Sequence, residues 1–225
     1  MAYSILIKNG MVLDGTGGEP YRADVGIAEN KIQDIGENLG NSAAKIIDAA
    51  KCYVAPGFID VTNHADVYGT LFFAPTQESM LMQGITTVLI GNCGESLAPL
   101  LKKDALNDLE KWTSGFSVPV DWRAITEFHE TLKKINIGVN VATLIGHETL
   151  KRNAANPDDM PALLEVSLKD GAWGFSSNFN FAEWTPELEE ETTRLLSVVK
   201  KHNALYKIHL RDEGKYLLPS VASFL

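Results

Sequence analysis

Cysteine is scarce in this sequence, and both long apolar runs and an excess of positive charge are absent. Only Cys52 and Cys93 occur among the 225 residues, which excludes a disulfide framework and favours a reducing compartment. No apolar run reaches the roughly 18 residues that a membrane span needs. The formal net charge of −9 gives no basic surface for nucleic acid. We therefore expect no membrane and no nucleic-acid partner.

The first residues also lack the basic region, apolar core and cleavage site of a secretory signal. They lead directly into a strand-like run. Together with the two separated cysteines, this predicts a cytoplasmic location. The remaining composition, 45% hydrophobic and 22% charged residues, is typical of a globular protein that builds a core.

Short β-prone runs separated by turn residues occupy residues 1–54. Asn9-Gly10 lies between two apolar runs and predicts a hairpin, because both central residues of a type I′ turn need positive φ. Glu29-Asn30 predicts a further turn. We expect a small β module here, forming one half of a β-sandwich.

From Tyr53 onward, apolar strands alternate with amphipathic helices, which predicts a parallel sheet in either an open doubly wound fold or a (β/α) barrel. Thr185 and Pro186 predict a helix start, the threonine as N-cap and the proline at N1. About five βα units are present, where a closed barrel has eight. We therefore expect an incomplete (β/α) barrel over residues 55–225, unfinished at Leu225. The expected strands are 54–61, 85–90, 138–145, 172–176 and 204–210, and the expected helices are 76–83, 104–113, 122–134, 158–169 and the one that begins at Thr185.

Residues with metal-binding side chains follow several of these strands. Reactive groups project from the carboxyl ends of strands in parallel α/β folds. Imidazole and thiolate are preferred zinc ligands, and catalytic zinc sites use three protein ligands plus water. The alternative for each residue is an ordinary packed or hydrogen-bonded position in the core. The polar residues at the strand ends include His64, Asp66, Cys93, His147, His209 and Arg211.

Five blocks of sequence occur in a fixed order: residues 56–64, 84–99, 146–150, 171–177 and 209–214. The first resembles the first barrel strand of the amidohydrolase superfamily, which ends in His-x-His. The second contains Gly91-Asn92-Cys93-Gly94 and resembles the D-aminoacylase branch, in which this cysteine binds metal. The likeness spans nearly all 225 residues and is to the amino-terminal portion of the N-acyl-D-amino-acid deacylase family.

The resemblance implies a zinc-dependent hydrolase that cleaves the amide of N-acyl-D-amino acids, a small-molecule substrate. Cys93 and His209 would bind the main zinc ion, and His64 a second, weaker metal position. Thr62 stands where the first histidine of His-x-His belongs, which weakens that second position further.

The resemblance also implies residues around the metal. Arg211 would bind the substrate carboxylate, its alternative being an ion pair with Asp212 or Glu213. Phe181 stands where the family has a tyrosine that helps to hold substrate. His147 and Asp66 are expected to support the metal ligands, the alternative for His147 being an ordinary hydrogen-bonding residue at a strand end.

The family's third zinc ligand and its catalytic aspartate would follow Leu225. We therefore expect the 225 residues alone to bind metal poorly and to hydrolyse little. Uncovered strand edges would favour self-association. Two alternatives stay open. A cyclic amidase of the hydantoinase or dihydroorotase type is disfavoured by Cys93, because those relatives generally bridge two metals with a carboxylated lysine. A non-catalytic scaffold remnant is favoured by Thr62 and Phe181.

Overall fold

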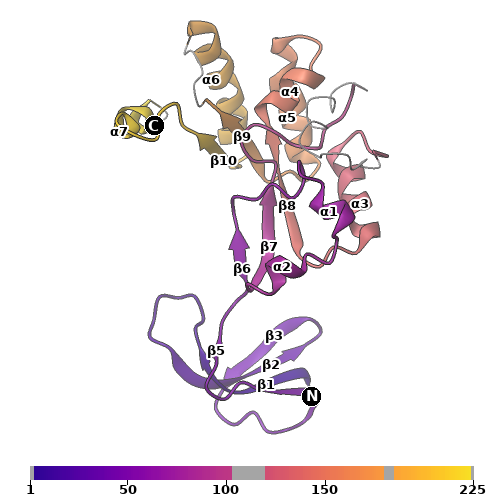
Figure 1. Ribbon diagram of the computed structural model, residues 1–225, viewed down its shortest axis with the longest axis vertical. Helices are drawn as coiled ribbons and strands as arrows, with labels where there is room; N and C mark the ends of the chain where they lie inside the picture. Colours follow the sequence, from indigo (N-terminus) through magenta and orange to yellow (C-terminus); the bar gives the residue numbers. More distant parts are fainter. Residues whose placement is uncertain (1–2, 103–119, 180–184, 224–225) are drawn as a thin grey trace. The chain divides into compact units, whose positions relative to one another are not determined.

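The computed structural model describes residues 3–102, 120–179 and 185–223 (Figure 1). Phe181 and the predicted helix at 104–113 lie outside these residues. The chain divides into two compact units, Met1–Gly57 and Phe58–Leu225. The boundary that the sequence predicts, between residues 54 and 55, lies at the end of strand β5 (Tyr53–Val54).

The first unit contains one five-stranded sheet with the order β3-β2-β1-β4, and β5 also pairs with β1. Glu29 and Asn30 have φ angles of 51° and 61°, so the predicted turn between β2 and β3 is confirmed. A second sheet that would complete a sandwich stays a prediction. The strands are β1 (Tyr3–Val12), β2 (Tyr21–Ala28), β3 (Lys31–Gly36), β4 (Ala43–Asp48) and β5.

The predicted hairpin at Asn9-Gly10 is wrong. β1 runs through both residues, and the register of its pairing with β2 shifts between Ile7 and Gly10. Asn9 does adopt the positive φ of 63° that its sequence suggests, but its backbone N–H donates to Asp24 Oδ1 at 3.0 Å. Asn9-Gly10 therefore forms a bulge within β1 and not a turn, because the pairing with β2 continues on both sides of it.

The second unit is a curled sheet of five parallel strands in the order β10-β9-β8-β7-β6. Each strand pairs in parallel with its neighbour. This confirms the α/β class and a half-barrel of the expected kind, while the number of complete βα units stays a prediction. The strands are β6 (Phe58–Asp60), β7 (Ile85–Ile90), β8 (Asn140–Gly146), β9 (Gly174–Asn178) and β10 (Leu205–His209).

Helices connect these strands. Thr185 caps the helix that follows it by accepting a hydrogen bond from Leu188 N at 3.3 Å, with Pro186 in the first turn, as the sequence predicts. In the described ranges, no helix is long and apolar enough to cross a membrane. The helices are α1 (Thr70–Phe73), α2 (Glu78–Leu81), α3 (Ile125–Ile135), α4 (His147–Asn153), the 3-10 turn η1 (Pro157–Asp159), α5 (Met160–Lys169), α6 (Pro186–Lys201) and α7 (Leu217–Ala222).

Trp122 links the loop after β7 to the helices of the second unit. It is 2% exposed, stacks on Phe72 at 5.7 Å and packs against Phe128 at 5.0 Å between ring centroids. Its indole N–H donates to the carbonyl oxygen of Leu97 at 2.7 Å. Truncating a buried tryptophan costs about 3–5 kcal/mol, so this side chain fixes the loop that follows Cys93.

Candidate functional site

Cys93 lies in a tight turn that follows β7. Gly91, Cys93 and Gly94 have φ angles of 77°, 56° and 79°. A Cβ at Gly91 would lie 2.1 Å from the carbonyl oxygen of Leu144, so only glycine fits there. Cysteine seldom adopts positive φ, and such backbone strain persists only where neighbouring groups enforce it.

Buried polar side chains enforce this turn. The Ser176 hydroxyl donates to the Gly91 carbonyl oxygen and accepts from Gly94 N at 3.1 Å. Asp66 Oδ2 accepts from Gly91 N at 2.9 Å. Asn92 Nδ2 donates to the backbone oxygens of Asn63 and Leu89 at 2.8 and 2.7 Å. The thiol is therefore presented by a rigid frame built from three strands and the segment after β6.

The Cys93 thiol lies between two imidazoles, one from the segment after β6 and one from the end of β10. Its Sγ is 3.7 Å from His64 Nε2 and 3.8 Å from His209 Nδ1. Sulfur and nitrogen ligands of one tetrahedral zinc ion lie about 3.6 Å apart, given the usual bond lengths. Both pair distances therefore fit ligation of a shared metal.

The complete ligand set is not assembled in the part of the chain that the structure describes. There, no group of three or more histidine, cysteine, aspartate or glutamate side chains is arranged to hold a metal ion. The Cys93 thiol instead makes two separate contacts, one with His64 and one with His209. The sequence's proposal that the three side chains converge at one mouth agrees with these contacts, and their role as ligands stays a prediction.

Burial sets the protonation of this cluster. It raises the pKa of the Cys93 thiol, although Lys207 opposes the effect, and it lowers the pKa of His64, an effect to which Lys207 adds. The cluster is thus biased toward a protonated thiol and a neutral imidazole. A neutral imidazole is ready to ligate metal, while the thiol must lose its proton first.

Glu213 approaches the far side of the His209 ring. His209 Nε2 lies 3.4 Å from Glu213 Oε1, while Nδ1 faces the thiol. A carboxylate on the second nitrogen fixes the tautomer and orientation of metal-binding histidines. From the sequence, Glu213 is expected only as an ion-pair partner of Arg211. Its position four residues after His209 is the feature that could have indicated its contact with the imidazole.

Lys207 also reaches the cluster and was not predicted. Its ammonium donates to Thr62 Oγ1 at 2.7 Å and to the carbonyl oxygen of Val61. The signal for it was the alternation of β10, since residues 207 and 209 point to the same face of a strand.

The structure places the other predicted site residues as follows. His147 is buried at the start of α4, and its Nε2 lies 2.8 Å from Glu191 Oε1 on α6. His147 therefore contacts Glu191 on α6 and not the thiol cluster. Asp66 is fully buried beneath the Cys93 turn, and burial raises its pKa to about 6. Arg211 is half-buried just after β10. Phe181 lies outside the described residues.

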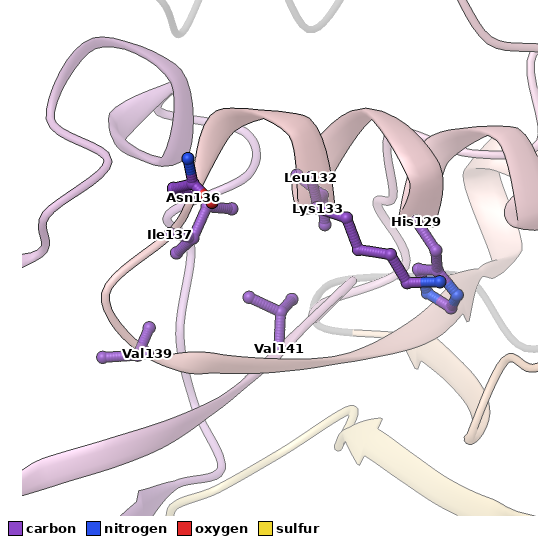
Figure 2. A pocket seen from close by; sticks show the side chains of 7 residues that line it. All are labelled: His129, Leu132, Lys133, Asn136, Ile137, Val139 and Val141. Atoms are coloured by element: carbon purple, nitrogen blue, oxygen red, sulfur yellow. The ribbon is translucent and has the colours of Figure 1, made fainter.

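A cavity of about 420 Å³ lies elsewhere, between α3 and β8 (Figure 2). Lys133 extends there toward His129, across from Val139 and Val141. Val141 lies in the amino-terminal half of β8 and Val139 directly precedes this strand, whereas Cys93 follows the carboxyl end of β7. Catalytic groups gather at the carboxyl ends of parallel strands, so we place the candidate site at Cys93 and not in this cavity.

A curled parallel sheet with a thiol and two imidazoles beyond the carboxyl ends of its strands is consistent with a partial (β/α) barrel. The chain belongs to the amidohydrolase family, whose family model matches residues 45–207.

Similar proteins extend this likeness over nearly the whole chain. A D-aminoacylase of Alcaligenes xylosoxydans xylosoxydans is 29% identical over 97% of this chain and 46% of its own length. The solved N-acyl-D-glutamate deacylase of Bordetella bronchiseptica, complexed with zinc and a phosphonate inhibitor, is 29% identical over 100% of this chain and 48% of that chain, with a TM-score of 0.83. A solved D-aminoacylase with a binuclear metal centre is 28% identical over 98% of this chain and 48% of that chain, with a TM-score of 0.80. The chain spans about half the length of these relatives.

Proposed function

We propose that this chain carries part of the active site of a zinc-dependent amidohydrolase that cleaves the amide of N-acyl-D-amino acids. The observation that carries the proposal is the Cys93 thiol, 3.7 Å from His64 Nε2 and 3.8 Å from His209 Nδ1. The similarity to D-aminoacylase and to N-acyl-D-glutamate deacylase supports the substrate class.

Cys93 and His209 would hold the zinc ion, with Glu213 orienting the imidazole of His209 through its outer nitrogen. A zinc ion held there supplies Lewis acidity, which polarises a carbonyl group and lowers the pKa of water from 15.7 to about 7. Ser176 and Asp66 would keep the thiol in place through their hydrogen bonds to the Cys93 turn.

Arg211 would bind the carboxylate of the amino-acid substrate. A guanidinium stays charged at any physiological pH and matches a carboxylate with two parallel donors. Its position two residues after His209 supports this assignment over a purely structural role. The net charge of −9 offers no basic surface for nucleic acid. A cytoplasmic location stays a prediction.

We assign no general acid or base among the described residues. The 225 residues taken alone are therefore expected to turn over slowly. They are also expected to bind zinc weakly, because only Cys93 and His209 are assigned to the main zinc ion, where catalytic sites use three protein ligands. Saturating zinc binding at submicromolar concentration together with rapid turnover would contradict this expectation.

Hydrolysis of N-acetyl-D-methionine and of its L enantiomer, followed with and without added zinc, tests the proposal. We expect zinc-dependent cleavage that favours the D enantiomer and that Cys93→Ala abolishes. Cys52→Ala is the matched control, because Cys52 is a free, exposed cysteine in the other unit. Equal cleavage of both enantiomers, or full activity in Cys93→Ala, would refute the proposal.

A further inference from the structure

Lys207 joins the two edge strands of the curled sheet. β6 and β10 are the first and last strands in the order of this sheet. Lys207 Nζ, from β10, donates to Thr62 Oγ1 at 2.7 Å and to the Val61 carbonyl oxygen, both just after β6. The ammonium therefore lies across the mouth of the half-barrel, beside the thiol cluster.

The alternation of β10 directs Lys207 to that place. Tyr206 stacks on the buried Phe175 at 5.8 Å between ring centroids, and its hydroxyl lies 2.8 Å from Ser177 Oγ. Tyr206 thus anchors one face of the strand in the core. Lys207 and His209 occupy the opposite face, and the contact of His209 with Cys93 shows that this face looks toward the thiol.

The ammonium bonds the residue that stands where the resemblance puts a ligand of a second metal ion. Thr62 occupies the position of the first histidine of His-x-His, and its hydroxyl oxygen accepts a hydrogen bond from Lys207. A threonine hydroxyl and a backbone carbonyl are poor ligands for zinc compared with imidazole. A divalent cation there would also lie against a fixed positive charge. The residues present therefore do not fit a second metal ion.

We propose that the Lys207 ammonium takes the place of a second metal ion, so that this site binds a single divalent ion at Cys93. The proposal rests on the metal site of the proposed function and concerns its stoichiometry. His64 Nε2 lies as near to the thiol as His209 Nδ1 does, at 3.7 against 3.8 Å. With no second ion to bind, His64 is available to the same ion as His209.

Cobalt binding tests this proposal without any need for turnover. The number of Co²⁺ ions per chain is measured by plasma mass spectrometry after dialysis against saturating Co²⁺, and thiolate ligation is followed by the sulfur-to-cobalt charge-transfer band. We expect one ion per wild-type chain. Two ions, or none, in the wild-type chain would overturn the proposal, whatever the variants do.

Substitutions sharpen the result. Thr62→His combined with Lys207→Met restores an imidazole and removes the charge, so we expect this double variant to bind two ions. Lys200→Met is the matched control, because Lys200 is exposed on α6, and it should bind one. Circular dichroism checks that each variant is folded. A folded double variant that still binds one ion would also overturn the proposal.

The outcome is separable from that of the proposed function. One ion per chain with equal cleavage of N-acetyl-D-methionine and its L enantiomer would refute the proposed function and leave the single-ion site intact. Two ions per chain with D-selective cleavage would do the reverse.

Discussion

Glu213 and Cys93 approach His209 from opposite sides of its ring: Glu213 Oε1 lies 3.4 Å from Nε2, and Cys93 Sγ lies 3.8 Å from Nδ1. The carboxylate therefore orients the nitrogen that faces the thiol. Removing such a supporting carboxylate usually lowers metal affinity 10–100-fold. Because the Glu213 side chain is 57% exposed, we expect Glu213→Gln to weaken cobalt binding by about 10-fold, at the lower end of that range.

Competition with a chromogenic chelator measures this affinity. Glu189→Gln is the matched control, because Glu189 is an exposed glutamate in the first turn of α6. Unchanged cobalt affinity in Glu213→Gln would show that the contact with His209 does not support a ligand.

The second prediction concerns Ser176, which holds the Cys93 turn. Its hydroxyl bonds both Gly91 and Gly94, and the side chain is fully buried. Ser176→Ala leaves a buried N–H and a buried carbonyl without partners, and each such group costs about 1–3 kcal/mol. We expect a loss of about 2–4 kcal/mol in unfolding free energy, together with weaker metal binding.

Urea denaturation followed by tryptophan fluorescence provides the measurement, since all four tryptophans follow residue 57 and so report on the second unit. Ser197→Ala serves as the control, because Ser197 is exposed on α6. A Ser176→Ala variant as stable as the control would mean that the turn is held by other contacts.

Asp66 makes stability depend on pH. Burial raises its pKa from 3.8 to about 6, so the folded state favours the protonated carboxyl group. The free energy of unfolding that the protonated carboxyl group contributes is fully present below pH 3.8. It is lost as the pH rises through about 6, because the unfolded state ionises first. A shift of this size corresponds to about 3 kcal/mol. We expect metal-free Asp66→Asn to show a smaller loss of stability between pH 4 and 7 than the wild type.

Unfolding in chelator at a series of pH values measures this difference. Asp158→Asn, which changes a carboxylate whose side chain is 82% exposed, should keep the wild-type profile. Parallel profiles for the wild type and Asp66→Asn would show that Asp66 titrates normally in the fold.

The edges of the curled sheet predict self-association of the 225-residue chain. Ile59 on β6 and Leu205 on β10 are 65% and 51% exposed, and unpaired strand edges with apolar side chains pair with other chains. We expect dimers or larger species at micromolar concentrations, with fewer in Ile59→Lys. Sedimentation velocity measures the distribution. Val166→Lys is the control, because Val166 is 53% exposed on the helix α5 and not on a strand edge. A monomer at every concentration would contradict the prediction.

Several elements of the fold are predictable from short stretches of sequence. The Thr185-Pro186 helix start and the Glu29-Asn30 turn form as predicted, because capping and positive φ depend on a few adjacent residues. Asn9-Gly10 carries the same kind of signal, but the hydrogen bond from Asn9 N to Asp24 and the pairing of β1 outweigh it, and no hairpin forms there. α4 was missed because it begins directly at the end of β8, without a turn to announce it.

The site was predictable to the extent that it follows from strand ends. Cys93, His64 and His209 meet because the carboxyl ends of parallel strands share one edge. The contact of Lys207 with Thr62 was not predictable, because it depends on how far the sheet curls to bring β10 toward β6. The pairing of His147 with Glu191 depends likewise on the packing of α4 against α6.

The order in which this site can form follows from the separation of its parts. The contact between Cys93 and His209 closes a loop of 116 residues, and neither side chain can reach the other until β8 and β9 have been laid down between them. Closing so long a loop is entropically slow and comes late in folding. Early in folding, the Cys93 thiol therefore lacks its contact with His209 and is exposed to oxidants and to free metal ions. Metal binding that requires both residues should begin only when β10 has packed into the sheet.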